Sequence, residues 1–218
     1  RQEASKIGVD VLKKGGNAFD AMLATELALA VSYPSAGNIG GGGFMVYRKS
    51  DGSTGALDYR ERAPINSTSD MYLDENMEII EGLSMIGGLS IAVPGTIAGI
   101  FEAHERHGTL TINELISPVI ELAKKGVIVT EKQKNRIEEN RKYFKLANKS
   151  KIIFDDEFNT NDTIKFPNLA ATLKRIMENG RDEFYKGETA KKLVDFVQNN
   201  GGILSLDDMQ SYEPVWRD

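Results

Sequence analysis

The chain has 218 residues, a length that fits one large domain, and 27 Lys and Arg against 32 Asp and Glu give a formal net charge of -5. This mild acidity argues against nucleic acid as the main partner, because phosphate binding requires a concentrated basic surface. The sequence has no Cys and two His, which excludes disulfides, thiolate metal sites, a cysteine nucleophile and a multi-histidine metal centre. With 40% hydrophobic and 27% charged residues, the chain is expected to be globular rather than disordered.

The N-terminal part predicts two helices followed by a hairpin. Apolar residues at helical spacing predict a helix over residues 4–12, and residues 18–31 are apolar on nearly every face, which is typical of a buried helix. A glycine-rich loop then leads to a strand at 44–48, a turn, and a returning strand at 56–59.

The rest of the chain predicts mainly helices. Leu89 to Val93 is predicted as a short buried strand that stops at Pro94. Pro118 is expected at the first position of a new helix after Ser117, because proline inside a helix removes a hydrogen bond. Further helices are predicted over residues 97–107, after Thr111 with Glu114, after Thr130 with Gln133, near 169–178 and 189–197, and after Ser205 with Asp208. Residues 148–162 are polar and weakly periodic, so we expect them to be irregular.

Three segments contain residue types found in binding or catalytic sites, but their local patterns favour structural roles. The glycines of residues 40–43 follow a helix and precede a strand, the reverse of a phosphate loop, so a tight backbone turn is favoured. His104 and His107 are three apart on one helix face, but no further His or Cys completes a metal site. Ser90 lacks the nucleophile-elbow pattern, which favours a structural role.

The segment from Asp58 to Pro64 carries an arginine where a strand ends. A guanidinium at this position offers a planar fork for a carboxylate, and flanking acids could orient it. The alternative is a surface ion-pair cluster of little energetic value. Composition alone favours the ion-pair cluster, because most exposed charge clusters are solvated.

A set of short segments nonetheless resembles one known family in order and spacing over nearly the whole chain. These are residues 15–21 (GGNAFDA), 37–44 (GNIGGGGF), 58–64 (DYRERAP), 71–74 (MYLD), 93–96 (VPGT), 185–187 (YKG), and Gly201-Gly202 with Asp207-Asp208 and Tyr212. Together they resemble the N-terminal part of the large subunit of a gamma-glutamyltranspeptidase.

The resemblance implies an α/β (α+β) fold of the N-terminal-nucleophile hydrolase type, an αββα sandwich. The chain would be a partial, helix-rich large-subunit region of one domain, 1–218, with a helix-and-hairpin core part at 1–95 and a mainly helical layer at 96–218. A precursor would cut itself into large and small subunits, and the small subunit's new N-terminal Thr would be the nucleophile. No cofactor or metal is implied.

The resemblance also reverses the interpretation of the charged segment. It implies that Arg60 binds the α-carboxylate of a gamma-glutamyl substrate such as glutathione, with Glu61 and Asp58 as weaker candidates for orienting the guanidinium. The implied partners are the small subunit of the same precursor and an amino acid or peptide acceptor. The family further implies a periplasmic or secreted location.

Several expected parts of the family pattern lie outside the sequence. The sequence starts without Met inside a predicted helix and stops without a terminal signal, so we expect both ends to be cuts. The catalytic Thr, the glycine pair of the oxyanion hole and the other glutamyl-binding residues are absent, so we expect the chain alone to be inactive. Other interpretations are a poly-gamma-glutamate depolymerase, a cephalosporin or glutaryl acylase, or an inactive truncated binding module. The full block from Asp70 to Asp74 favours the transpeptidase over the depolymerase.

Overall fold

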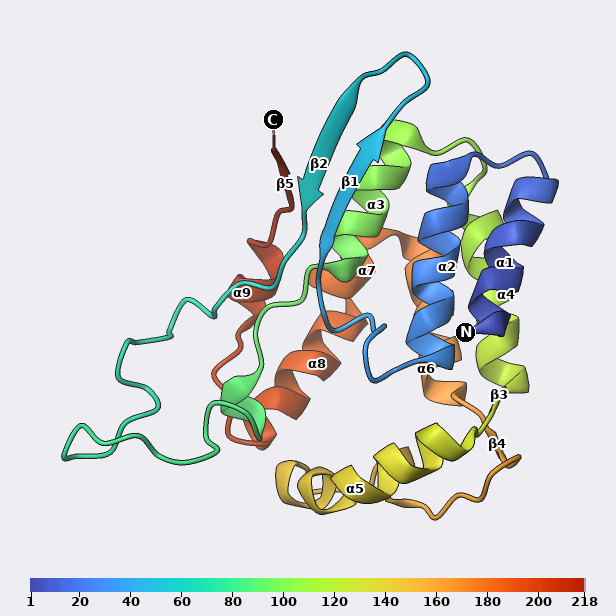
Figure 1. The fold of residues 1–218 in the computed structure, drawn as a ribbon. Coiled ribbons are helices and arrows are strands. Elements are labelled where there is room, and N and C mark those ends of the chain that lie inside the picture. Colours follow the sequence, from blue (N-terminus) through green and yellow to red (C-terminus); the bar gives the residue numbers. More distant parts are fainter. Residues whose placement is uncertain (218) are drawn as a thin grey trace.

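The computed structural model describes residues 1–217 and combines a layer of helices with a small antiparallel sheet (Figure 1). The α-helices are α1 (Gln2–Lys13), α2 (Ala18–Ser32), α3 (Thr96–His107), α4 (Ile112–Lys125), α5 (Glu131–Ala147), α6 (Pro167–Asn179), α7 (Arg181–Tyr185), α8 (Glu188–Asn199) and α9 (Leu206–Gln210). The strands are β1 (Phe44–Arg48), β2 (Thr54–Asp58), β3 (Val127–Ile128), β4 (Thr163–Ile164) and β5 (Val215–Arg217), and the 3-10 turns are η1 (Gly88–Ser90) and η2 (Ile153–Asp155).

The main sheet has three strands in the order β1-β2-β5, and both pairs are antiparallel. Met45, Leu57 and Trp216 lie opposite one another in register. Met45 and Leu57 are buried, whereas Phe44 and Val46 on the alternate positions are 59% and 80% exposed. Because side chains alternate across a strand, one face of the sheet packs on the helices and the other is uncovered.

Helix α2 lies inside the helical layer, as its apolar composition predicts, and contacts α1, α3 and α4. Its N-terminus is closed by a capping box of Asn17 and Asp20. The fully buried carboxylate of Asp20 also accepts hydrogen bonds from the main-chain nitrogens of Thr109 and Leu110, at 3.0 and 3.3 Å from its oxygens. One acidic side chain therefore ties the start of α2 to the connection between α3 and α4.

The capping boxes predicted at Thr111, Thr130 and Ser205 all form, so these helix starts follow from the sequence. The prediction of a new helix at Pro118 is wrong, because α4 runs through it without interruption. Helix α4 packs against α2 and α6, and its buried apolar residues lie both before and after the proline. This packing outweighs the hydrogen bond that the proline cannot make.

The prediction of a buried strand from Leu89 to Val93 is also wrong. The segment begins in the turn η1, and Val93 forms a single bridge with Arg62. The elements α7, β3, β4 and β5 were not predicted, since each has five residues or fewer and shows too short a pattern to detect. Residues 148–162 contain only the short turn η2, in agreement with the expected irregular segment.

Hydrophobic side chains from the first helix to Tyr212 form one main core cluster. A smaller cluster lies beneath α5 and is centred on Val129, Ile137 and Ile164. The long segment between β2 and η1 extends away from the helices as a loop (Figure 1). Among residues 1–217, no helix has the length and apolar character that crossing a membrane requires.

Candidate functional site

Arg60 stands two residues after the end of β2, with a side chain that is 61% exposed. Its Nε donates to a carboxylate oxygen of Glu61 at 3.1 Å, and its guanidinium lies 5.7 Å from the centre of the Phe44 ring. Within residues 1–217, its two terminal nitrogens have no hydrogen-bond partner. The fork of the guanidinium is therefore open to an incoming anion.

The structure brings Asp58 and Glu61 to Arg60, but in different roles. Glu61 contacts the guanidinium itself. Asp58 instead accepts a hydrogen bond from the main-chain nitrogen of Arg60 at 3.0 Å, and its other oxygen accepts from Nε of Arg217 at 2.9 Å. These two contacts hold the pKa of Asp58 below its usual range, and the main-chain hydrogen bond from Arg60 has the larger effect. Asp58 thus shapes the backbone at Arg60 rather than orienting the fork.

The glycine loop before β1 packs directly against the backbone that leads to Arg60. A Cβ at Gly42 would lie 2.4 Å from the main-chain oxygen of Tyr59, so only glycine fits there. The main-chain oxygen of Gly41 accepts hydrogen bonds from the nitrogens of Gly95 and Thr96, at 2.7 and 2.9 Å. This geometry agrees with the tight backbone turn that the sequence favours over a phosphate-binding loop.

Two tyrosines from the C-terminal part of the chain also hold this backbone in place. The hydroxyl of Tyr185, in α7, donates to the main-chain oxygen of Pro94 at 2.8 Å and accepts from the nitrogen of Ala98 at 3.1 Å. The ring of Tyr185 stacks on that of Tyr212, with the planes 10° apart. The hydroxyl of Tyr212 donates to the main-chain oxygen of Arg60 at 2.7 Å. Segments far apart in the chain therefore converge on the backbone around Arg60.

The sequence offers no signal for these tyrosine roles. Tyr185 and Tyr212 are separated from their hydrogen-bond acceptors by 91 and 152 positions. They belong to segments that carry the family resemblance, but nothing in their neighbourhood indicates a contact with Arg60.

The other sequence candidates have local structural roles. Nε2 of His104 lies 2.7 Å from the main-chain oxygen of Leu110, and the ring of His107 stacks on Phe19. The two histidines therefore engage different partners, and the described part of the chain contains no cluster suited to a metal ion. The hydroxyl of Ser90 donates to the main-chain oxygen of Gly87 at 2.8 Å.

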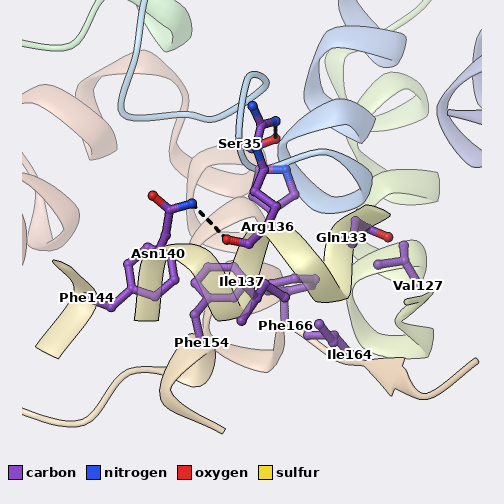
Figure 2. A pocket seen from close by; sticks show the side chains of 11 residues that line it. Ser35, Val127, Gln133, Arg136, Ile137, Asn140, Phe144, Phe154, Ile164 and Phe166 are labelled. Carbon is purple, nitrogen blue, oxygen red and sulfur yellow. Dashed lines mark hydrogen bonds between the residues drawn. The ribbon is translucent and has the colours of Figure 1, made fainter. Parts of the chain in front are cut away.

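A cavity of about 410 Å³ lies elsewhere, beside α5 (Figure 2). Aromatic and aliphatic side chains line most of it, and Arg136 reaches Oγ of Ser35 at 3.0 Å. Its lining includes none of Arg60, Glu61 and Asp58. Its polar lining residues are Ser35, Gln133, Arg136 and Asn140.

Comparison with known proteins adds a finding independent of this geometry. The sequence model described as Gamma-glutamyltranspeptidase matches residues 4–218. The chain belongs to this family. The matched range includes every segment that carries the resemblance, and the Arg60 cluster lies within it.

Individual family members are similar over the whole chain. The glutathione hydrolase proenzyme of Pseudomonas sp. (strain A14) is 44% identical over 214 residues, which are 96% of this chain and 37% of that protein. The solved gamma-glutamyltranspeptidase from Pseudomonas nitroreducens complexed with L-DON is 44% identical with a TM-score of 0.92, covering 100% of this chain and 64% of the other. The chain thus spans little more than a third of the length of that curated relative.

A more distant structure is similar as well. The cephalosporin acylase from Bacillus halodurans is 26% identical with a TM-score of 0.82, covering 99% of this chain and 41% of that one. The fold is therefore shared with an enzyme named for another substrate, and the fold alone does not distinguish between these activities.

Proposed function

We propose that the complete protein hydrolyses glutathione and related gamma-glutamyl compounds, or transfers their gamma-glutamyl group to an amino acid or peptide. The names of the similar proteins support this proposal, since they include glutathione hydrolase proenzyme and gamma-glutamyltranspeptidase at 44% identity. The word proenzyme also supports the proposed cleavage into a large and a small subunit.

The exposed guanidinium of Arg60 is the observation that carries the substrate assignment. A carboxylate accepts two parallel hydrogen bonds from such a fork, which selects substrates bearing a free α-carboxylate. Glu61 holds Nε at 3.1 Å and leaves the terminal nitrogens for the substrate. In this proposal Arg60 binds, Glu61 orients the guanidinium, and Asp58 shapes the adjoining backbone.

The reacting group in this proposal is the N-terminal Thr of the small subunit. Its hydroxyl attacks the gamma-carbonyl carbon, and its own α-amino group accepts the proton. Backbone donors stabilise the tetrahedral oxyanion, and the leaving amine takes up the proton. Water or an acceptor amine then releases the glutamyl group from the ester.

The proposal also includes the αββα arrangement. Phe44 and Val46 form an apolar face on the side of β1 that the helices leave uncovered. A second sheet, built largely from the rest of the protein, would cover this face and complete the sandwich. A periplasmic or secreted location is proposed from the family resemblance alone.

The test is steady-state kinetics of the complete gene product with gamma-glutamyl-p-nitroanilide. Replacing the arginine fork by a point charge, Arg60→Lys, should raise KM at least about tenfold, because a charge-assisted pair of hydrogen bonds is lost. The turnover number should change far less, because Arg60 does not touch the reacting carbonyl. The matched control is Arg48→Lys, an exposed arginine of the same hairpin.

An unchanged KM in Arg60→Lys would remove Arg60 from the site. A complete protein that releases no p-nitroaniline, yet cleaves a glutaryl or cephalosporin amide, would establish the acylase alternative. A protein without a processed Thr terminus and without either activity would be the truncated binding module.

A further inference from the structure

Arg60 lies beyond the ladder that holds β2, which ends at Asp58. Its main-chain nitrogen donates to the carboxylate of Asp58 at 3.0 Å. Its main-chain oxygen accepts from the hydroxyl of Tyr212 at 2.7 Å. Main-chain hydrogen bonds hold the flanking residues, from Tyr59 to Gly43 and from Arg62 to Val93. The main chain of Arg60 itself, from which the guanidinium projects, is held by two side chains, Asp58 and Tyr212.

Tyr212 is held firmly enough to act as a fixed point. It is 2% exposed, and its ring stacks on Tyr185 with the centroids 5.7 Å apart. Its own main-chain oxygen accepts from a terminal nitrogen of Arg181 at 2.5 Å. The guanidinium of Arg62 lies 5.1 Å from the centre of the Tyr212 ring and donates a hydrogen bond to the main-chain oxygen of Glu213.

Close packing against Gly95 restricts the position of the Tyr212 hydroxyl. A Cβ at Gly95 would lie 2.2 Å from this hydroxyl and 1.9 Å from the main-chain oxygen of Tyr59, so the glycine allows the close approach. Burial raises the pKa of Tyr212 to about 12. The hydroxyl therefore remains a hydrogen-bond donor throughout the pH range in which such an enzyme is assayed.

We infer that Tyr212 is a positioning residue for substrate binding: its hydroxyl fixes the main chain of Arg60 and so directs the guanidinium to the α-carboxylate of the substrate. This inference rests on the proposed function. It assigns to the end of the chain a part in recognising the substrate, although the hydroxyl of Tyr212 bonds to the backbone of Arg60 and not to its guanidinium.

The test compares two donors in the complete enzyme. Tyr212→Phe removes the hydroxyl and retains the ring stack. For gamma-glutamyl-p-nitroanilide we expect KM to rise about 3- to 10-fold with kcat within about twofold of wild type. For 4-aminobutyryl-p-nitroanilide, which lacks the α-carboxylate, kcat/KM should stay within about twofold, because the fork has nothing to bind.

The matched control is Tyr72→Phe. This variant also removes a tyrosine hydroxyl that donates to a main-chain oxygen, that of Leu89 at 3.2 Å, but in the loop away from Arg60. It should leave KM and kcat unchanged with both p-nitroanilide substrates. If Tyr212→Phe does not fold, 4-fluorophenylalanine at position 212 fills the space of the hydroxyl without donating, and the same donor comparison applies to it.

The outcomes separate this inference from the proposed function. A wild-type enzyme without activity on gamma-glutamyl-p-nitroanilide overturns both. If Arg60→Lys raises KM but Tyr212→Phe does not, the positioning role alone is overturned. Equal losses of kcat/KM for the two donors in Tyr212→Phe would mean general structural damage and would also overturn the role.

Discussion

At the scale of single residues, Tyr59 places its hydroxyl against a carboxylate that is mostly buried. The hydroxyl lies 3.2 and 3.3 Å from the two oxygens of Glu26, in α2. Burial raises the pKa of Glu26 from 4.5 to about 6, and the hydrogen bond from Tyr59 offsets this in part. The residue is therefore easier to protonate in the folded protein than in the unfolded chain.

This raised pKa makes the free energy of unfolding depend on pH. Below pH 4.5 the carboxyl is protonated in both states, and the shift has no effect on stability. Between 4.5 and about 6 the folded state binds more protons, so the free energy of unfolding falls as the pH rises. Above about 6 the full penalty, about 2 kcal/mol, is present.

Replacing this carboxyl by an amide, Glu26→Gln, should therefore stabilise the protein at neutral pH. We expect the free energy of unfolding at pH 7 to rise by about 1–2 kcal/mol and the gain to vanish at pH 4, because the neutral amide has no charge to desolvate. Urea denaturation at both pH values measures it. The exposed Glu157→Gln is the control, and a gain in Glu26→Gln that is equal at pH 4 and 7 would contradict the explanation.

At the scale of elements, the start of α3 is satisfied from outside the helix. Its N-cap is Gly95, which has no side chain to accept the free main-chain N–H groups. The main-chain oxygen of Gly41 accepts from Thr96, and the hydroxyl of Tyr185 accepts from Ala98. Two segments distant in the sequence thus provide the cap.

Removing the second acceptor, Tyr185→Phe, should destabilise the protein. The change leaves the N–H of Ala98 and the carbonyl of Pro94 buried without their partner, at an expected cost of about 2–4 kcal/mol. Denaturant midpoints at constant slope measure it. Tyr143→Phe, at an exposed tyrosine on α5, should change stability by less than about 0.5 kcal/mol, and a similar loss in both variants would argue against the capping role.

At the scale of the whole molecule, the sheet is covered on one side only. Phe44, Val46 and Val215 are 59%, 80% and 41% exposed on its other face. Apolar positions that alternate with buried ones on a strand are typical of a sheet packed on both faces. The chain also spans only 37% of a curated relative that is 44% identical to it.

We therefore expect residues 1–218 expressed alone to release no p-nitroaniline from gamma-glutamyl-p-nitroanilide. Arg60 could still bind a carboxylate, but in the proposed mechanism the Thr nucleophile belongs to the small subunit. The complete gene product, assayed in parallel, is the positive control. Release by the isolated chain at a rate near that of the complete protein would place the nucleophile within these residues.

Local patterns in the sequence determined most of the helices and the main hairpin. Capping boxes at Thr111, Thr130 and Ser205 were predicted because each depends on side chains three residues apart. The family followed from short segments kept in order. Arg60 could be singled out only through that resemblance, because composition favoured a solvated ion pair.

Only the tertiary structure decided what holds Arg60 in place. The hydrogen bond from Tyr212 joins residues 152 positions apart, and that from Tyr185 to Pro94 joins residues 91 apart. The continuous helix through Pro118 likewise depends on packing against α2 and α6. Such contacts depend on how elements stack in space, and a sequence pattern reports only on neighbours within a turn or a strand.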